Sequence, residues 1–367
     1  MGDPISRRRF LGRGGQLALG VAAAAALGGC ADADQADDTV SGGAQPGTQD
    51  FKGESLTMLV YSGLTEQLYK RHFVPQFEAA TGAKVTLESA WTEGIARLQA
   101  AAEGNPPFDV VQNDPTQGAP AIKAGLFQQF DVTRITNASR LAPRLLEADV
   151  WKQGYALPFH SSAMTLVTNT ALRPEPYRSW LELLTDPPQD GVMLYNLPYM
   201  SVYTFAAMKA EQEGKVGTAA QTLRDDPDSV LRFAIANRGL VEYFWTSTTD
   251  GMNALLRGEV AAGNMHGNGP LTPKREGKPV TGVRPPGDIG YAQVWYAIPQ
   301  KVRNLDLSLA AINHIASPEF QGALAASGEY SCAIPELAAA HAAKDPEWAA
   351  TFPHTADDFA ALTYYTY

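Results

Sequence analysis

The amino-acid sequence predicts an α/β protein of two domains. Along residues 55–115, short apolar runs of strand length alternate with segments whose apolar side chains recur at helical spacing. This alternation is typical of a parallel sheet with crossover helices. The chain has 367 residues, of which 45% are hydrophobic. It is therefore long enough for two domains and apolar enough to bury a core in each.

Each predicted element has a local cause in the sequence. The predicted strands cover residues 56–61, 84–87 and 108–111, and the predicted helices cover residues 65–81 and 93–102. In the first helix, Leu68, Phe73 and Phe77 recur at helical spacing. Gly82 follows them, where a C-cap glycine belongs.

Two loops of this sheet are expected to carry a binding site. Ligands of open α/β sheets bind beyond the carboxyl ends of the strands. Tyr61 and Ser62 follow the first strand, and Asn113 and Asp114 lie in the loop after the third. These four residues are therefore candidates by position, before any chemistry is considered.

The charge and the cysteine content exclude several classes of protein. A formal net charge of −10 argues against nucleic acid as the main partner, because a phosphate backbone favours a basic surface. Two cysteines cannot form a disulfide framework or a four-thiolate zinc site, and we expect Cys332 to be a buried small hydrophobe. The chain carries no serine-hydrolase elbow, zinc-protease motif or phosphate-binding loop. We therefore expect no enzyme activity, no catalytic residue, no cofactor and no metal.

The first thirty residues predict export rather than a folded element. Residues 6–11, Ser-Arg-Arg-Arg-Phe-Leu, have the form of a twin-arginine signal, and the apolar run of residues 17–27 is too short to span a bilayer. The run ends in Leu-Gly-Gly-Cys, which resembles the lipobox of bacterial lipoproteins. Residues 1–29 are thus the expected signal peptide and Cys30 the expected lipidation site. A plain signal peptide with an incidental cysteine is the alternative.

Residues 30–54 are expected to form a flexible tether. This segment is rich in Asp, Gly, Ser and Gln and has almost no large apolar side chain. It cannot bury enough surface to offset the entropy of ordering. The folded body should therefore begin near Ser55.

Several segments of the body resemble the extracellular solute-binding proteins of bacterial ABC importers. Residues 77–85, Phe-Glu-Ala-Ala-Thr-Gly-Ala-Lys-Val, are similar to the opening helix and strand of that family. Further segments match in the same order, at residues 107–111, 124–126, 155–159, 179–184, 256–261, 296–299 and 310–319. The length of the chain without its signal peptide is most similar to the polyamine (spermidine/putrescine)-type branch.

The resemblance implies a two-lobed fold of the periplasmic-binding-protein type (type II), with a ligand cleft between the lobes. Lobe I would comprise residues 55–159 and 267–303, and lobe II residues 160–266 and 304–367. The lobes would close over a small-molecule ligand by hinge bending. The protein would then be a monomer, anchored through Cys30 at the outer face of the cell membrane, that hands its ligand to the permease of an ABC transporter.

The resemblance also assigns ligand-binding residues. Tyr61, Ser62, Asn113 and Asp114 match two contact loops of the polyamine-type family, and residues 193–201 match a third. The remaining candidates lie in that third loop or near the later crossings of the chain between the lobes: Tyr199, His266, Asn268, Tyr291 and Trp295. His266 stands where the family has a tryptophan.

The expected ligand is a small organic cation or amine, with a polyamine-like compound as one option. Residues 191–210 contain no acidic residue, although polyamine binders place carboxylates there. Asp114 alone would balance one positive charge, and an unpaired buried charge costs several kcal/mol. Aromatic faces, to which Trp91 and Trp245 could add, bind cations through cation–π contacts. They would equally suit a planar heterocycle or a sugar.

Two alternatives remain open. Tyrosine oxygens are hard ligands, so Tyr195, Tyr199 and Tyr203 suggest ferric iron as a lesser option. An exported hydrolase or a ligand sensor built on the same scaffold is the other functional hypothesis, because catalytic residues can meet in space without a sequence motif.

Overall fold

The computed structural model of the protein describes residues 50–90, 93–101, 104–285, 290–360 and 362–364, with only the backbone of residues 160–162, 290–292 and 363–364. All of them belong to one compact unit of the chain. The expected signal peptide, the lipidation site Cys30, most of the tether and Trp91 lie outside the described residues.

The described residues form the following elements. The strands are β1 (Ser55–Val60), β2 (Lys84–Ser89), β3 (Val110–Asn113), β4 (Ala156–Asn169), β5 (Val192–Tyr195), β6 (Val241–Trp245), β7 (Ala262–His266), β8 (Val280–Val283), β9 (Gly290–Ala297) and β10 (Thr363–Tyr364). The α-helices are α1 (Leu64–Leu68), α2 (Val74–Thr81), α3 (Glu93–Gln99), α4 (Pro115–Lys123), α5 (Pro143–Leu146), α6 (Asp149–Lys152), α7 (Glu182–Thr185), α8 (Pro198–Gln212), α9 (Ala219–Asp225), α10 (Pro227–Ala236), α11 (Thr248–Arg257), α12 (Leu271–Arg275), α13 (Leu305–Ile315), α14 (Pro318–Ala326), α15 (Pro335–Ala342), α16 (Pro346–Thr351) and α17 (Ala356–Ala360). The π-helical turn η1 (Tyr69–Phe73) and the 3-10 turns η2 (Val132–Arg134), η3 (Thr136–Arg140) and η4 (Arg238–Leu240) complete the set.

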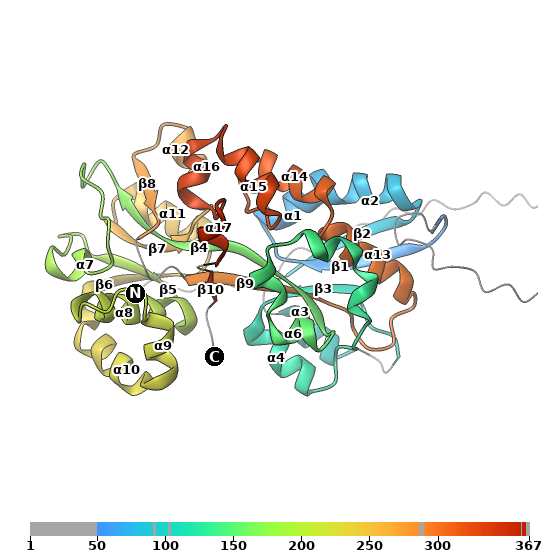
Figure 1. Cartoon of the computed structure of the whole chain (residues 1–367). Coiled ribbons are helices and arrows are strands. Elements are labelled where there is room, and N and C mark those ends of the chain that lie inside the picture. Colours follow the sequence, from blue (N-terminus) through green and yellow to red (C-terminus); the bar gives the residue numbers. More distant parts are fainter. Residues whose placement is uncertain (1–49, 91–92, 102–103, 286–289, 361, 365–367) are drawn as a thin grey trace, which may run out of the picture. The chain divides into compact units, whose positions relative to one another are not determined.

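Neighbouring strands are hydrogen-bonded in the spatial order β2-β1-β3-β9-β4-β7-β5-β6. In addition, β10 pairs with β9 and β8 pairs with β4 (Figure 1). Strands β2, β1 and β3 pair in parallel, as do β6, β5 and β7. Strand β9 is antiparallel to β3 and to β4, and β7 is antiparallel to β4. The parallel pairing of the first three strands confirms the pattern predicted from the sequence.

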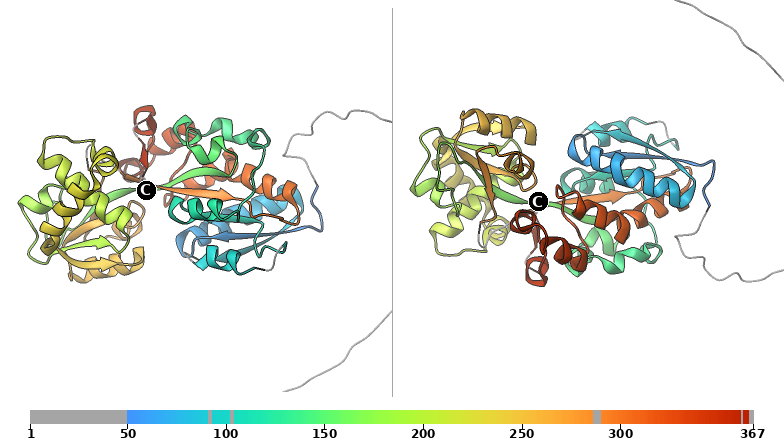
Figure 2. Two further views of the ribbon diagram at one scale, coloured as in Figure 1. Left: turned by 90° about the horizontal axis from the view of Figure 1, so that it is seen from below. Right: turned by 90° about the horizontal axis from the view of Figure 1, so that it is seen from above.

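Strand β4 belongs to both parts of this sheet. Residues 156–160 pair with β9, whereas residues 164–168 pair with β7. The register with β9 shifts between His160 and Ala163, at the point where the strand changes partners. The green β4 and the orange β9 lie side by side in both views of Figure 2. One strand therefore carries the chain from the first lobe into the second.

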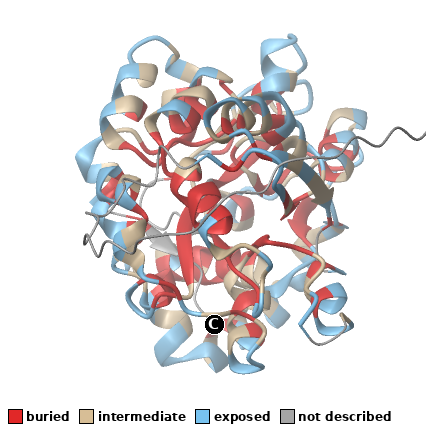
Figure 3. Ribbon diagram, turned by 90° about the vertical axis from the view of Figure 1, so that its right-hand side faces the viewer, coloured by how far each residue is buried: buried red, intermediate tan, exposed pale blue. Residues whose placement is uncertain are grey.

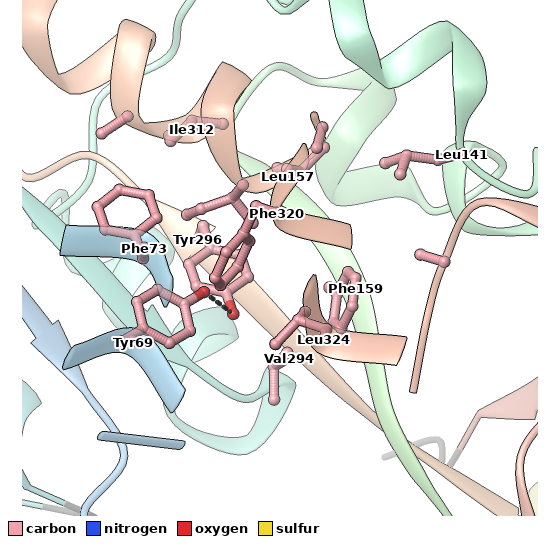
Figure 4. Packing of buried hydrophobic residues seen from close by; sticks show 14 of the residues in the cluster. Tyr69, Phe73, Leu141, Leu157, Phe159, Val294, Tyr296, Ile312, Phe320 and Leu324 are labelled. Carbon is pink, nitrogen blue, oxygen red and sulfur yellow. Dashed lines mark hydrogen bonds between the residues drawn. The ribbon is translucent and has the colours of Figure 1, made fainter. Parts of the chain in front are cut away.

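The first lobe is built around aromatic side chains of η1, β9 and the C-terminal helices (Figure 4). The hydroxyl of Tyr69 donates a 2.6 Å hydrogen bond to that of Tyr296, so both buried polar groups have a partner. The ring of Phe320 packs edge-on against Tyr69 and Phe73. Phe51, which belongs to the segment predicted to be a tether, joins this core just before β1 begins at Ser55.

The C-terminal segment packs into the same core. Ile312, Phe320, Trp348 and Phe359 lie in the first cluster of buried residues. Helix α13 contacts β3 and η3, and α14 contacts η1. This packing groups the segment with the first lobe, whereas we expected residues 304–367 in lobe II. Strand β8 was expected in lobe I, as part of residues 267–303. It pairs instead with the second half of β4, which belongs to the second lobe.

The second lobe has a separate core formed by β5, β7, α8 and α11. Its largest fully buried side chains are Trp180, Trp245, Tyr177 and Tyr203. Helices α8, α9 and α10 contact one another and cover this core (Figure 1). In Figure 3 the buried residues follow the strands and the inner faces of the helices, with exposed residues on loops and outer faces. Within the described part of the chain, no helix has both the length and the apolar character needed to cross a bilayer.

The local structure differs from the sequence prediction at two places. The helix predicted for residues 65–81 is α1, the π-helical turn η1 and α2 in succession, although it ends at Gly82 in the left-handed conformation, as expected. Asn113 belongs to β3 and not to the loop after it, because it pairs with Trp295 of β9. This pairing decides where the Asn113 side chain lies.

Candidate functional site

A cavity of about 660 Å³ lies between residues of the two lobes. The first lobe contributes the loop after β1, the start of α4 and the turn after α14, and the second contributes the ends of β5, β6 and β7. The described lining residues are Tyr61, Ser62, Gly63, Leu64, Thr65, Glu93, Asp114, Gln117, Tyr195, Asn196, Leu197, Tyr199, Thr246, Ser247, Thr248, Thr249, His266, Asn268, Gly269, Thr272, Gln293, Val294, Glu329 and Tyr330. Most of them lie within five residues after the end of a strand, which is where a ligand of an α/β sheet is expected.

Tyr61 is fixed at the end of β1 by hydrogen bonds at both ends of the residue. Its backbone N–H donates to Oε1 of Gln112 at 2.8 Å, and its hydroxyl donates to Oδ2 of Asp114 at 3.3 Å. Burial, followed by the negative charge of Asp114, raises the pKa of the Tyr61 hydroxyl well above its usual value. Tyr61 therefore stays a neutral donor at the cavity wall.

Asp114 is both a helix cap and a charge at the cavity. As the N-cap of α4, it accepts hydrogen bonds from the backbone N–H groups of Thr116 and Gln117, at 2.7 and 3.3 Å. Its Oδ2 accepts from Nε2 of Gln117 at 3.1 Å and from Tyr61. A capping carboxylate is stabilised by the helix N-terminus, so its negative charge is kept beside the cavity.

Asn113 and Trp295 do not line this cavity, although both were predicted to bind ligand. Their side chains pack against α4, where the Cβ of an alanine at Gly118 would lie 2.2 Å from Oδ1 of Asn113 and 2.5 Å from the Trp295 ring. The Trp295 indole N–H donates to Oε1 of Gln293 at 2.8 Å. Strand alternation does not explain the result, because both Gln293 and Val294 of β9 line the cavity. The packing against α4 explains it instead.

The second lobe presents an aromatic wall. The Tyr195 ring stacks on Trp245, with centroids 4.2 Å apart, and its edge contacts Tyr199 and His266. Asn264 holds this group in place, because its Oδ1 accepts from the backbone N–H of Tyr195 at 2.8 Å and from the Trp245 indole at 3.2 Å. Trp245 itself is buried behind Tyr195.

His266 adds a neutral ring to this wall. Burial lowers the pKa of its imidazole to about 4, so the ring carries no charge at neutral pH. Ser62, predicted from its position after a strand, and Asn268, predicted from the family resemblance, also line the cavity. The side chain of Tyr291 lies outside the described residues, and its backbone pairs with Ala163 in β4.

Three carboxylates stand among the described lining residues, although the sequence pointed only to Asp114. Glu93 comes from the first turn of α3, and Glu329 from the turn after α14. The rule that ligands bind after strands could not find Glu329, because no strand precedes it. Glu93 lies four residues after the end of β2, so the same rule could have predicted it.

The electrostatic character of the cavity follows from this composition. Among the lining residues that the structure describes, none is lysine or arginine, and the single histidine is neutral. A cation lies beside one lining carboxylate, because Nη1 of Arg71 is 3.6 Å from Oε2 of Glu329. The arrangement attracts positive charge and disfavours anions.

The described residues give no support to a metal centre built from common ligands. No group of three or more His, Cys, Asp or Glu side chains comes together in the part of the chain that the structure covers. Of the three tyrosines considered for iron, Tyr203 is buried in the second core, away from the cavity lining. Cys332 is a buried free cysteine, as expected, and burial raises the pKa of its thiol to about 12.

Sequence comparison gives the family. Residues 72–353 match the family described as bacterial extracellular solute-binding protein. The chain is also 25% identical over 270 residues to the spermidine/putrescine-binding periplasmic protein of Escherichia coli, a match that covers 72% of this chain and 74% of that protein.

Solved structures share the fold. An ABC transporter substrate-binding protein from Bradyrhizobium japonicum aligns with a TM-score of 0.72 at 17% identity, covering 86% of this chain and 94% of that one. The spermidine/putrescine ABC transporter substrate-binding protein of Streptococcus pneumoniae aligns with a TM-score of 0.67 at 15% identity and the same coverage of both chains. These similarities confirm the predicted two-lobed α/β fold of the periplasmic-binding-protein type. The match over residues 72–353 shows that the chain belongs to the family of bacterial extracellular solute-binding proteins, which are binding proteins and not enzymes.

Proposed function

We propose that this protein is the receptor of an ABC importer and that it captures a small organic cation or amine in the cavity between its lobes. The observation that carries the proposal is the composition of the cavity: three carboxylates and an aromatic wall, with no lysine or arginine among the described lining residues. Aromatic faces and carboxylates are the two groups that bind an ammonium ion in a partly dry site. The similarity to spermidine/putrescine-binding proteins supports the same class of ligand.

Capture would involve closure of the lobes. Tyr61, Asp114 and Glu329 lie on the first lobe, and Tyr195, Tyr199 and His266 lie on the second. A ligand that touches both sets gains contacts only when the lobes approach, so its binding energy favours the closed form. The expected partner of the closed monomer is the permease of the transporter.

Isothermal titration calorimetry with the purified protein tests the ligand class. The panel contains butylamine, putrescine, spermidine, choline, a neutral sugar, a phosphonate and ferric citrate. We expect binding of at least one amine, weakened about tenfold or more by Tyr199→Ala and unchanged by Tyr155→Ala, a partly buried tyrosine outside the cavity. Binding of the phosphonate or of ferric citrate alone would contradict the proposal. Turnover of an ester or peptide library without amine binding would instead favour the hydrolase.

Export and anchoring are a separate part of the proposal and rest on the N-terminal sequence. Residues 6–11 would direct twin-arginine export, and Cys30 would carry the lipid at the outer face of the membrane. Metabolic labelling with a radioactive fatty acid should label the wild-type protein and not Cys30→Ser. Equal labelling of both proteins would contradict an anchor at Cys30.

A further inference from the structure

We infer that Arg71 is a specificity-determining residue that limits the number of positive charges a ligand can carry. This inference rests on the proposed function, because it concerns a cationic ligand in the same cavity. Its basis is the position of Arg71, which is not itself a lining residue but lies beside one of the lining carboxylates.

Glu329 is held between two elements at the edge of the cavity. Its Oε2 lies 3.6 Å from Nη1 of Arg71 on η1, and its Oε1 accepts a 3.5 Å hydrogen bond from Oγ1 of Thr272 on α12. The Glu329 side chain is 25% exposed, whereas that of Arg71 is 53% exposed. Arg71 is thus the more exposed partner of the pair, and Glu329 is the partner that lines the cavity.

The guanidinium of Arg71 offsets the charge that Glu329 offers to a ligand. Two unit charges about 4 Å apart interact by about 1 kcal/mol in water and by more in a partly buried setting. Asp114 can match one ammonium group, whereas a further ammonium group at Glu329 would have to share that carboxylate with Arg71. The site therefore favours ligands with fewer ammonium groups over ligands with three.

The ion pair is too exposed to matter much for folding. Exposed pairs contribute about 0–1 kcal/mol to stability, so Arg71→Gln should fold normally. Arg134 is a matched control, because it is also an exposed arginine in an ion pair, at 2.7 Å from Asp306, and does not line the cavity.

The test measures the dissociation constants of butylamine, putrescine and spermidine by calorimetry for the wild type, Arg71→Gln, Arg71→Lys and Arg134→Gln. We expect Arg71→Gln to tighten spermidine binding at least threefold and to change butylamine binding less than twofold. Arg71→Lys keeps the charge and should keep the wild-type ratio, as should Arg134→Gln. In a Glu329→Gln background, Arg71→Gln should lose its effect, because its partner is gone.

The outcomes separate this inference from the proposed function. If amines bind but Arg71→Gln changes mono- and triamine binding equally or not at all, the role of Arg71 is wrong and the receptor proposal stands. If no amine binds to the wild type, both fail together.

Discussion

The rings of Tyr195 and Trp245 stack with their centroids 4.2 Å apart, so that a buried tryptophan supports a tyrosine of the cavity wall. The contact lies at the adjacent ends of two paired strands, because Tyr195 ends β5 and Trp245 ends β6. The wall that faces the ligand is thus an extension of the second core. Its geometry depends on a side chain that no ligand needs to touch.

Truncating Trp245 should unfold the second lobe more easily. Trp245→Ala removes a fully buried ring and leaves Asn264 without the indole donor, so we expect a loss of about 3–5 kcal/mol in the free energy of unfolding. Urea denaturation followed by circular dichroism measures it. Phe244→Ala is the control, because this neighbour in β6 is 50% exposed and its loss should cost under about 1 kcal/mol. Similar losses in both variants would contradict the assigned core.

The charge of Asp114 and its capping role can be separated by Asp114→Asn. Asparagine caps helices about as well as aspartate, so the free energy of unfolding should change by less than about 1 kcal/mol. The affinity for a cationic ligand should fall about tenfold, because one carboxylate is lost from the cavity. Calorimetry on an amine that binds the wild type measures the affinity. Asp131→Asn, which alters the cap of η2 away from the cavity, should bind like the wild type.

Stability should fall as the pH falls from about 6.5 to 4. Burial lowers the pKa of His266 to about 4 in the folded protein, and the imidazole has its ordinary value near 6.5 when unfolded. Within that window the unfolded chain binds a proton that the folded chain does not, so acid favours unfolding by at most about 3 kcal/mol. His314, whose pKa burial also lowers to about 4, adds to the same trend.

Urea denaturation at pH 7.0 and 4.5 checks the assignment to His266. His266→Gln should lose less stability between the two pH values than the wild type does. Equal losses would show that His266 does not titrate as described. His314→Gln, measured in parallel, isolates the contribution of the first lobe.

The close packing of α4 against β3 and β9 makes Gly118 sensitive to substitution. A Cβ there would overlap Asn113 and Trp295, so Gly118→Ala should destabilise the protein by about 1–3 kcal/mol. Gly322→Ala in α14 is the matched control, because the nearest atom to its Cβ would be Leu337 Cδ1 at 3.9 Å. Alanine is the better helix former, so this variant should gain up to about 1 kcal/mol. Thermal denaturation that ranks the two variants the other way would contradict the packing.

Local pattern was enough to predict the first strands and part of the site. Apolar runs placed β1 and β2, and the position after a strand placed Tyr61, Ser62 and Asp114 at the cavity. The pattern misplaced Asn113 by assigning it to a loop, and the pairing of that residue with β9 comes from more than 180 residues away in the chain. In the folded chain, Asn113 and Trp295 pack against α4 and lie outside the cavity lining.

The negative charge that Glu329 adds to the cavity could not be predicted from the sequence, for a different reason. Glu329 and Tyr330 lie in a turn between helices, and they reach the cavity because α14 packs on η1 in the first core. That packing was not expected, since residues 304–367 were placed in the other lobe. The order of segments along the chain thus placed α14 in the second lobe, whereas its packing brings Glu329, in the turn after it, to the first-lobe side of the cavity.

The double use of Asp114 also bears on how such a receptor can change its ligand over generations. A substitution there that discards the carboxylate and the cap together weakens α4, and selection for a folded protein acts against it. Glu329 has no such tie to a helix end, and its partners are two side chains, Arg71 and Thr272. New ligand preferences should therefore arise through positions 329 and 71 first, with position 114 restricted to residues that still cap α4.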